Sequence, residues 1–271
     1  MAPESAAGSS PAPELLFSVT NLTKTFLPGG PAEAKALAGV NLEIRAGEFL
    51  LIAGANGSGK TVLMLILAGL MESSGGEVLF RGRSLDRARG ELRRHIGLVF
   101  QDADAQIVGE TVAEDVAFGP KNLGFSGAAL EGQILQAMRA VGLEDKGLCS
   151  PRNLSGGEKR RLAVAGVLAM GCGTVILDEP FANLDWPGVA QVQEVLRNLK
   201  REGKTVILLT HELEKALPLA DRLVILHRGV VREDGAPGAV LDRLKDEYGV
   251  RDPRKGYAPP MDPSWVSGDA L

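Results

Sequence analysis

The stretch that decides the fold is FLLIAGANGSGKT, residues 49–61. It begins with a continuous apolar run, 49–54, which is typical of a buried strand in a parallel sheet. The glycine-rich part that follows matches the pattern G-x-x-x-x-G-K-[ST], and residues 60–71 read as a buried helix. A strand, a glycine loop and a helix in this order predict that residues 54–61, called the phosphate loop below, hold the phosphates of a nucleotide.

The residue types in the phosphate loop suit this chemistry. Gly57 and Gly59 allow backbone N–H groups to converge on the β- and γ-phosphates. Lys60 would neutralise phosphate oxygens, and the hydroxyl of Thr61 would bind Mg²⁺. The structural alternative is a glycine turn that only opens a helix. The residues that we assign to nucleotide contacts in this loop are Asn56, Gly57, Ser58, Gly59, Lys60 and Thr61.

A second apolar strand ends in two acids, within TVILDEP at 174–180. Ligands of open α/β folds lie at the carboxyl ends of the strands, so we expect Asp178 to hold Mg²⁺ there. The carboxylate of Glu179 is then free to orient and polarise an attacking water. An acidic pair that simply faces solvent is the structural alternative.

Two further polar residues follow apolar strands. Gln101 comes after IGLVF, 96–100, and we expect its side chain to reach both the metal and the water. His211 comes after TVILLT, 205–210, where it suits a hydrogen bond to the γ-phosphate. Each would be weak evidence alone, and their placement at strand ends beside a phosphate loop carries the assignment.

A second glycine pair lies in NLSGGEKRR, 153–161. Ser155 and Glu158 have the spacing of a capping box, so a helix start without a ligand is the simpler interpretation. However, Gly156 and Gly157 lower helix propensity by roughly 1 kcal/mol each and bare N–H groups that an anion would use. Because the phosphate loop already serves its own nucleotide, we expect this second pair to bind the γ-phosphate held by another copy or a paralogue.

The rest of the chain shows three patterns. Residues 15–50 alternate apolar and polar positions, which predicts short antiparallel strands. Residues 84–170 hold mainly helical patterns. From 174 to 227, strand-like and helix-like segments alternate, and this alternation predicts a parallel sheet with crossover helices.

Composition narrows the class of protein. The 271 residues carry a net charge of −4, so no basic excess marks a nucleic-acid binder. Cys149 and Cys172 match no metal or redox spacing. The longest uncharged stretch, 162–177, is short for a membrane span, so we expect a soluble protein that can sit on a membrane partner. Residues 1–14 read as a disordered lead rather than a signal peptide, and the polar tail 245–271 as weakly ordered.

The full set of motifs resembles the ATP-binding subunits of ABC transporters over about residues 15–240. In chain order the motifs are the phosphate loop, Gln101, LSGGE (154–158), VILDEP (175–180), Asp185 and His211. The resemblance implies an α/β P-loop NTPase (RecA-like) fold: a mostly parallel sheet with helices on both faces, an N-terminal antiparallel β subdomain, and a helical subdomain carrying LSGGE. The implied single domain is 15–244, with the β subdomain at 15–50, the nucleotide-binding core at 51–101 and 171–228, and the helical subdomain at 102–170.

The resemblance also implies ligands and partners. Phe26 occupies the place of the aromatic residue that stacks on adenine, and ANLD (182–185) matches the D-loop, whose Asp185 lies near the opposite site of a dimer. The expected cofactors are ATP and Mg²⁺. The expected partners are a second ATPase subunit, in a homodimer or a paralogue heterodimer, and an integral membrane coupling protein at the cytoplasmic face of the membrane, with no nucleic acid.

A narrower resemblance concerns LVFQDADAQIVGETVAEDVAFGPKNLG, 98–124. It is similar to ATPases of cobalt, nickel and vitamin importers of the energy-coupling-factor type, in which this stretch forms a groove for the coupling helices of the membrane partner. Asp102, Asp104 and Gln106 would then face basic side chains of that partner. A solvated acidic loop is the alternative.

Three positions depart from the family pattern: Val62 replaces Ser or Thr, Phe181 replaces Thr, and 171–173 replaces a more polar turn. None of them removes a residue assigned to the chemistry.

Other interpretations of the motifs are an ATPase of another ABC importer or exporter, a DNA-repair ATPase and a small-molecule kinase. The compact gap between the motifs argues against the second, and LSGGE with Asp185 argues against the third. The cargo stays open, because components outside this chain select it.

Overall fold

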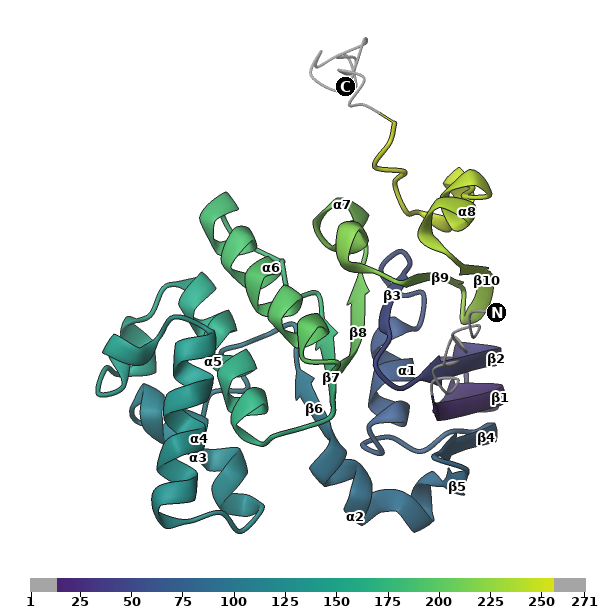
Figure 1. Ribbon diagram of the computed structural model, residues 1–271. Coiled ribbons are helices and arrows are strands. Elements are labelled where there is room, and N and C mark those ends of the chain that lie inside the picture. Colours follow the sequence, from purple (N-terminus) through teal and green to yellow (C-terminus); the bar gives the residue numbers. More distant parts are fainter. Residues whose placement is uncertain (1–13, 256–271) are drawn as a thin grey trace, which may run out of the picture.

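The central sheet has six strands in the order β10-β9-β3-β8-β7-β6, in a computed structural model that describes residues 14–255 (Figure 1). Its strands are β3 (Phe49–Ala53), β6 (Ile96–Val99), β7 (Thr174–Asp178), β8 (Thr205–Thr210), β9 (Arg222–His227) and β10 (Val230–Gly235). All neighbours pair in parallel except β9 and β10, which form an antiparallel hairpin at the edge. The prediction of a mostly parallel sheet is therefore confirmed, and the antiparallel edge strand is a feature that the alternation did not predict.

The second sheet is antiparallel and has the order β2-β1-β4-β5. Strands β1 (Leu15–Phe26) and β2 (Ala34–Arg45) come from the segment predicted to form it. Strands β4 (Gly75–Phe80) and β5 (Arg83–Ser84) come from beyond the first helix and extend the sheet on the other side of β1. The antiparallel subdomain is thus larger than its sequence pattern indicated.

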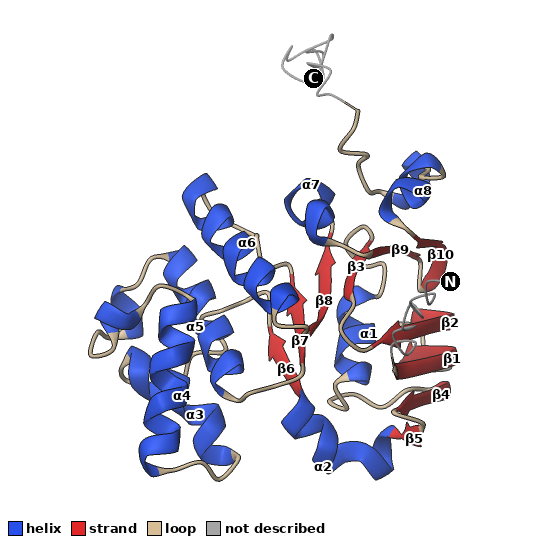
Figure 2. Cartoon of the chain, in the orientation of Figure 1, coloured by secondary structure: helices blue, strands red, loops and turns tan. Residues whose placement is uncertain are grey.

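The helices fall into two groups (Figure 2). A separate helical subdomain contains α3 (Val112–Asn122), α4 (Gly127–Ala140) and α5 (Gly156–Ala169). The others lie against the sheets: α1 (Lys60–Leu67), α2 (Leu85–His95), α6 (Trp186–Arg201), α7 (Leu213–Ala216) and α8 (Pro237–Asp242). Short 3-10 turns add Glu144–Lys146, Pro151–Asn153, Leu217–Leu219 and Asp246–Tyr248. Among residues 14–255, no helix combines the length and apolar character needed to cross a bilayer.

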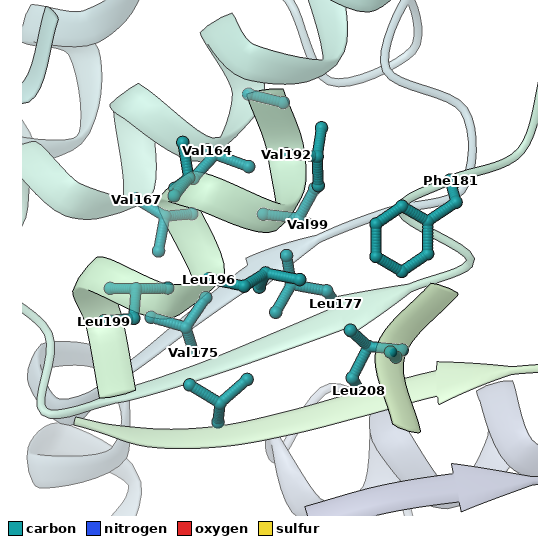
Figure 3. Packing of buried hydrophobic residues seen from close by; sticks show 14 of the residues in the cluster. Val99, Val164, Val167, Val175, Leu177, Phe181, Val192, Leu196, Leu199 and Leu208 are labelled. Atoms are coloured by element: carbon teal, nitrogen blue, oxygen red, sulfur yellow. The ribbon is translucent and has the colours of Figure 1, made fainter. Parts of the chain in front are cut away.

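Two apolar clusters form the core, one on each face of the central sheet. Strand β3 serves both, because Phe49 and Leu51 point into the larger cluster while Leu50 and Ile52 point into the other. In the larger cluster, side chains of α5 and α6 pack over β6, β7 and β8 (Figure 3). This packing fixes the helix that carries the second glycine pair against the strand that carries the two acids.

The segment after α8 returns to the body of the protein. Tyr248 and Val250 are buried in the larger cluster, and the ring centroid of Tyr248 lies 5.6 Å from that of His227. Gly249 has φ +65°, and a Cβ atom there would lie 2.8 Å from the Cβ atom of Ala55 in the phosphate loop. Composition predicted weak order from residue 245, whereas the structure packs this part against β9 and the phosphate loop. The expected lead, apart from residue 14, and the tail beyond 255 lie outside the described residues.

Candidate functional site

The phosphate loop lies between β3 and α1, at the carboxyl edge of the central sheet, and its own chain holds it tightly. A Cβ atom on Gly54 would lie 2.2 Å from the carbonyl oxygen of Leu226, and one on Gly59, which has φ +104°, would lie 2.5 Å from that of Ala36. The N–H of Gly229 donates to the carbonyl of Ser58 at 2.9 Å. Glycine is therefore required at both ends of the loop for it to fit between β9 and β2.

Lys60 is buried at the start of α1. Its Nζ donates to the carbonyl oxygens of Gly54 at 2.6 Å and Ala55 at 3.2 Å, and lies 3.9 Å from Oε1 of Glu179. Burial lowers the pKa of this amine, against the opposing attraction of Glu179 and Asp178. The loop thus presents a cation close to Glu179, the residue that follows β7.

Thr61 and Asp178 form an oxygen pair that links α1 to β7. The hydroxyl of Thr61 donates to Oδ2 of Asp178 at 2.7 Å. Burial raises the pKa of Asp178, and the neighbouring charge of Glu179 raises it further. A hydroxyl and a carboxylate fit Mg²⁺, which takes one or two protein ligands and completes its shell with water and phosphate oxygens.

Glu179 has an unusual backbone and well-defined partners. Its φ is +47°, in the left-handed region that non-glycine residues seldom adopt. Its Oε2 accepts from the hydroxyl of Thr210 at 2.8 Å, and its Oε1 lies 2.8 Å from Nδ1 of His211. The structure therefore brings together Glu179 and His211, two residues that the sequence analysis assigned to separate tasks. The sequence analysis missed Thr210, the last residue of β8 and the neighbour of His211. Its place at a strand end could have identified it as a partner of Glu179.

Gln101 lies just after β6, with an exposed side chain. It lines a cavity of about 410 Å³ together with Gly156, Lys159 and Asn183. Its carbonyl oxygen accepts a hydrogen bond from the guanidinium of Arg160 at 2.7 Å. Gln101 thus lies at the junction between the sheet and α5.

The second glycine pair begins α5, and its capping box is formed. The side chain of Ser155 accepts from the N–H of Glu158 at 3.3 Å, and Glu158 accepts from the N–H of Ser155 at 2.9 Å. A Cβ atom on Gly156 would meet nothing within 4 Å. Ser155, Gly156, Gly157 and Asp185 line a cavity of about 470 Å³. Within the described residues, neither Ser155 nor Asp185 shares a hydrogen bond with the phosphate loop, so these residues form a second, separate group.

Asp185 also has a local function. Its Oδ1 accepts from the N–H of Gly188 at 3.0 Å and so caps α6.

Phe26 ends β1 with 37% of its surface exposed, and Lys24 Nζ lies 5.2 Å from the centroid of its ring. Phe26 pairs with Ala34, on the strand whose Ala36 carbonyl faces Gly59.

Several polar residues of the 98–124 stretch form contacts within the chain itself. The side chain of Gln106 accepts from the N–H of Phe100 at 3.1 Å and donates to the carbonyl of Leu98 at 2.9 Å. Asp104 forms an ion pair with Lys159 at 2.6 Å. The amide of Gln106 therefore holds the end of β6, and its side chain also lines the groove described next, so its expected contact with a partner stays a prediction. Asp102 accepts from the N–H groups of residues 104 and 105 and shapes a turn.

A groove of about 500 Å³ lies beside this stretch, and its exposed apolar side chains include Leu70, Val108 and Phe118.

Of the positions that depart from the family pattern, Val62 packs against the smaller cluster and Phe181 is fully buried in the larger one. Both side chains therefore serve packing.

Comparison with known proteins gives a consistent result. The family model described as ABC transporter matches residues 37–182. The cobalt import ATP-binding protein CbiO of Rhodobacter capsulatus is 43% identical over 250 residues, which cover 91% of this chain and 86% of that protein. The energy-coupling factor transporter ATP-binding protein EcfA2 of Methanospirillum hungatei is 41% identical over 210 residues, 76% of this chain. The chain spans about half of the length of that second relative, 53%.

Solved structures share the fold. CbiO1 of Clostridium perfringens, described as part of the ABC transporter complex CbiONQ, superposes with a TM-score of 0.76 at 32% identity, covering 86% of this chain and 92% of that one. The ATP-binding cassette MJ0796, in a dimeric post-hydrolysis state bound to ADP and Pi, gives 0.74 at 29% identity, covering 82% and 99%.

Proposed function

The chain belongs to the family of ABC transporter ATP-binding proteins, and from this membership we infer that it binds and hydrolyses ATP to drive import through a membrane partner. The observation that carries the inference is the placement of Glu179. Its carboxylate lies against His211 and Thr210, within 3.9 Å of Lys60 Nζ, beside the Thr61–Asp178 pair.

We assign roles by charge and reach. Lys60 and the N–H groups of the phosphate loop bind the β- and γ-phosphates, and Thr61 with Asp178 holds Mg²⁺. When bound, Mg²⁺ neutralises charge that develops on the phosphate oxygens. Glu179 orients and polarises the attacking water, while His211 steadies that carboxylate and donates to the γ-phosphate. The exposed side chain of Gln101 completes the site from the end of β6.

We assign the second group, Ser155, Gly156, Gly157 and Asp185, to a nucleotide held by another subunit. The openness of Gly156 supports this role, because no atom of its own chain needs a glycine there. The dimeric state of MJ0796 with ADP and Pi supports a head-to-tail pair around nucleotide. The partner is a second copy of this chain or a paralogue.

We assign the groove beside 98–124 to an integral membrane protein. Val108 and Phe118 are 60% and 54% exposed in it, which is a large apolar exposure for a surface without a partner. The chain would then act as a peripheral subunit at the cytoplasmic face of the membrane. The name of the Rhodobacter capsulatus relative supports cobalt as cargo, and that of the Methanospirillum hungatei relative supports an importer of the energy-coupling-factor type.

Two variants test the composite site. Glu179→Gln should lower steady-state ATP hydrolysis by at least about 100-fold, keep ATP binding and accumulate a dimer on size-exclusion chromatography with ATP. Adding Ser155→Arg to that variant should abolish the dimer and leave nucleotide bound to the monomer. Unchanged hydrolysis in Glu179→Gln would contradict the role of Glu179, and ATP-dependent dimers in the double variant would contradict the second group.

A further inference from the structure

A buried arginine connects the two groups of site residues. Arg160, in the second turn of α5, is only 6% exposed. Its Nη1 donates to the carbonyl oxygens of Gln101 at 2.7 Å and Glu179 at 3.2 Å, and its Nη2 donates to that of Ala182 at 3.1 Å. One side chain thus links the helix of the second glycine pair to the Gln101 segment, the backbone of Glu179 and the D-loop.

The segment that Arg160 holds is strained. Glu179 has φ +47° and Asn183 has φ +58°, so two non-glycine residues within five positions adopt the left-handed region. Such conformations persist only where neighbouring contacts determine them. The N–H of Glu179 donates to the carbonyl of Leu209, and Arg160 binds the carbonyl on the other side of the same residue. These two contacts fix the direction in which the Glu179 side chain leaves the backbone.

The chemistry of the guanidinium suits this task. Its N–H donors lie in a fixed plane, so one group can bind carbonyls from several segments at set angles. A lysine ammonium is a compact charge on a flexible chain and cannot reproduce that geometry. Burial lowers the pKa of Arg160, and the nearby charges of Asp102, Glu179 and Asp178 oppose this effect.

We propose that Arg160 is a positioning residue for ATP hydrolysis. It fixes the backbones of Glu179 and Gln101 relative to α5, so that seating a phosphate on the Ser155 loop at one interface and aligning Glu179 at the other are coupled within one subunit. This inference rests on the proposed function and adds to it the contact through which the two half-sites of a subunit communicate. Within a single turn of α5, the chain changes from a ligand-binding end to a support for the catalytic segment.

The next residue provides a matched control. Arg161 is 8% exposed, and its Nη1 donates to the carbonyls of Val141 at 2.7 Å and Gly142 at 3.2 Å, just after α4. Its hydrogen bonds therefore stay within the helical subdomain and reach neither Gln101 nor Glu179, while its side chain also lines the cavity of the second group. In both arginines Nε is buried without a partner among the described residues, so the two side chains resemble each other in burial and in the loss that a substitution would cause.

The test compares Arg160→Lys with Arg161→Lys in the full-length protein. Arg160→Lys should lower kcat about tenfold or more, since small misplacements of catalytic groups have effects of this size, with KM and affinity for ATP within about twofold of the parent. The cooperativity of hydrolysis with ATP concentration should also fall. Arg161→Lys, which removes no hydrogen bond to Gln101, Glu179 or Ala182, should lower kcat much less than Arg160→Lys while lowering the melting temperature as much.

Equal kcat losses in the two variants, in step with their melting temperatures, would overturn the proposal and leave Arg160 as a structural residue. If Arg160→Lys does not fold, Arg160→Gln and Arg161→Gln provide the same comparison. Glu179→Gln in the same assay separates the two levels of inference. If that variant stops turnover while Arg160→Lys and Arg160→Gln hydrolyse normally, only the role of Arg160 fails; if it hydrolyses ATP normally, the proposed site itself fails.

Discussion

The two glycine-rich loops of this protein need their glycines for different reasons. In the phosphate loop, added Cβ atoms on Gly54 and Gly59 would meet backbone oxygens of the same chain at 2.2 and 2.5 Å. At the start of α5, a Cβ atom on Gly156 would meet nothing, and one on Gly157 would lie at an ordinary contact distance of 3.7 Å from Leu184. The first loop is thus shaped by its own fold, whereas no described atom of this chain requires a glycine at position 156, as the proposed external phosphate would.

The largest effect should follow from Gly59→Ala. Its φ of +104° and the oxygen of Ala36 together make the substitution strained and crowded, and we expect a loss of about 2 kcal/mol or more in the free energy of unfolding together with loss of ATP binding. Urea denaturation and titration with a fluorescent ATP analogue measure the two effects. Gly203→Ala is the control, because its φ is +69° and its Cβ atom would meet nothing within 4 Å. Equal losses in both variants would remove the fold-based explanation for the first loop.

Gly156→Ala should show the opposite combination. Alanine favours a helix over glycine by up to about 1 kcal/mol, so we expect a more stable protein. The added methyl group should still lower ATP-dependent dimer formation and turnover, because it occupies the space that a phosphate would approach. Unfolding curves and hydrolysis rates on the same preparation check both effects. A stabilised variant with full turnover would show that no ligand requires this glycine.

The smallest effect on stability should come from Asp178→Asn, on the phosphate-loop side. Because burial raises the pKa of Asp178, the folded protein binds this proton more readily than the unfolded chain, and stability falls as pH rises through the carboxyl range. Removing the charge should raise the melting temperature by about 2 °C at pH 7 and flatten its dependence on pH between 4 and 7, although hydrolysis is lost. A lower melting temperature at pH 7 would mean that its attraction to Lys60 and Arg160 outweighs burial.

The parts of the fold that the sequence predicts are those with local signals. Apolar runs identify β3, β7 and β8, and the residue types at fixed spacing identify the phosphate loop. Strands β4 and β5 lack a strong sequence pattern. Their place in the antiparallel sheet comes from long-range pairing, of β4 with β1 and of β5 with β4. Strand β10 is similarly made by a hairpin in which Arg228 and Gly229 both have positive φ.

The candidate site divides in the same way. Each predicted polar residue at a strand end could be found because strand ends meet at one edge of the sheet. The contacts of Arg160 could not be, because its three carbonyl partners lie 59, 19 and 22 positions away. The contacts of Gln106 could not be predicted for a related reason, because its partners are backbone groups of Leu98 and Phe100 at the end of β6 and no side-chain pattern reveals them.

The packing of Tyr248 and Gly249 behind Ala55 has a practical consequence for deletion series and gene fusions. A chain shortened to residue 244 would uncover the ring of His227 and remove the backbone beside Ala55, so we expect it to bind nucleotide more weakly through lost packing, without any regulatory role of the tail. A reporter joined after residue 255 leaves that support in place. The packed structure therefore extends to a tyrosine and a glycine that lie well beyond the last of the motifs.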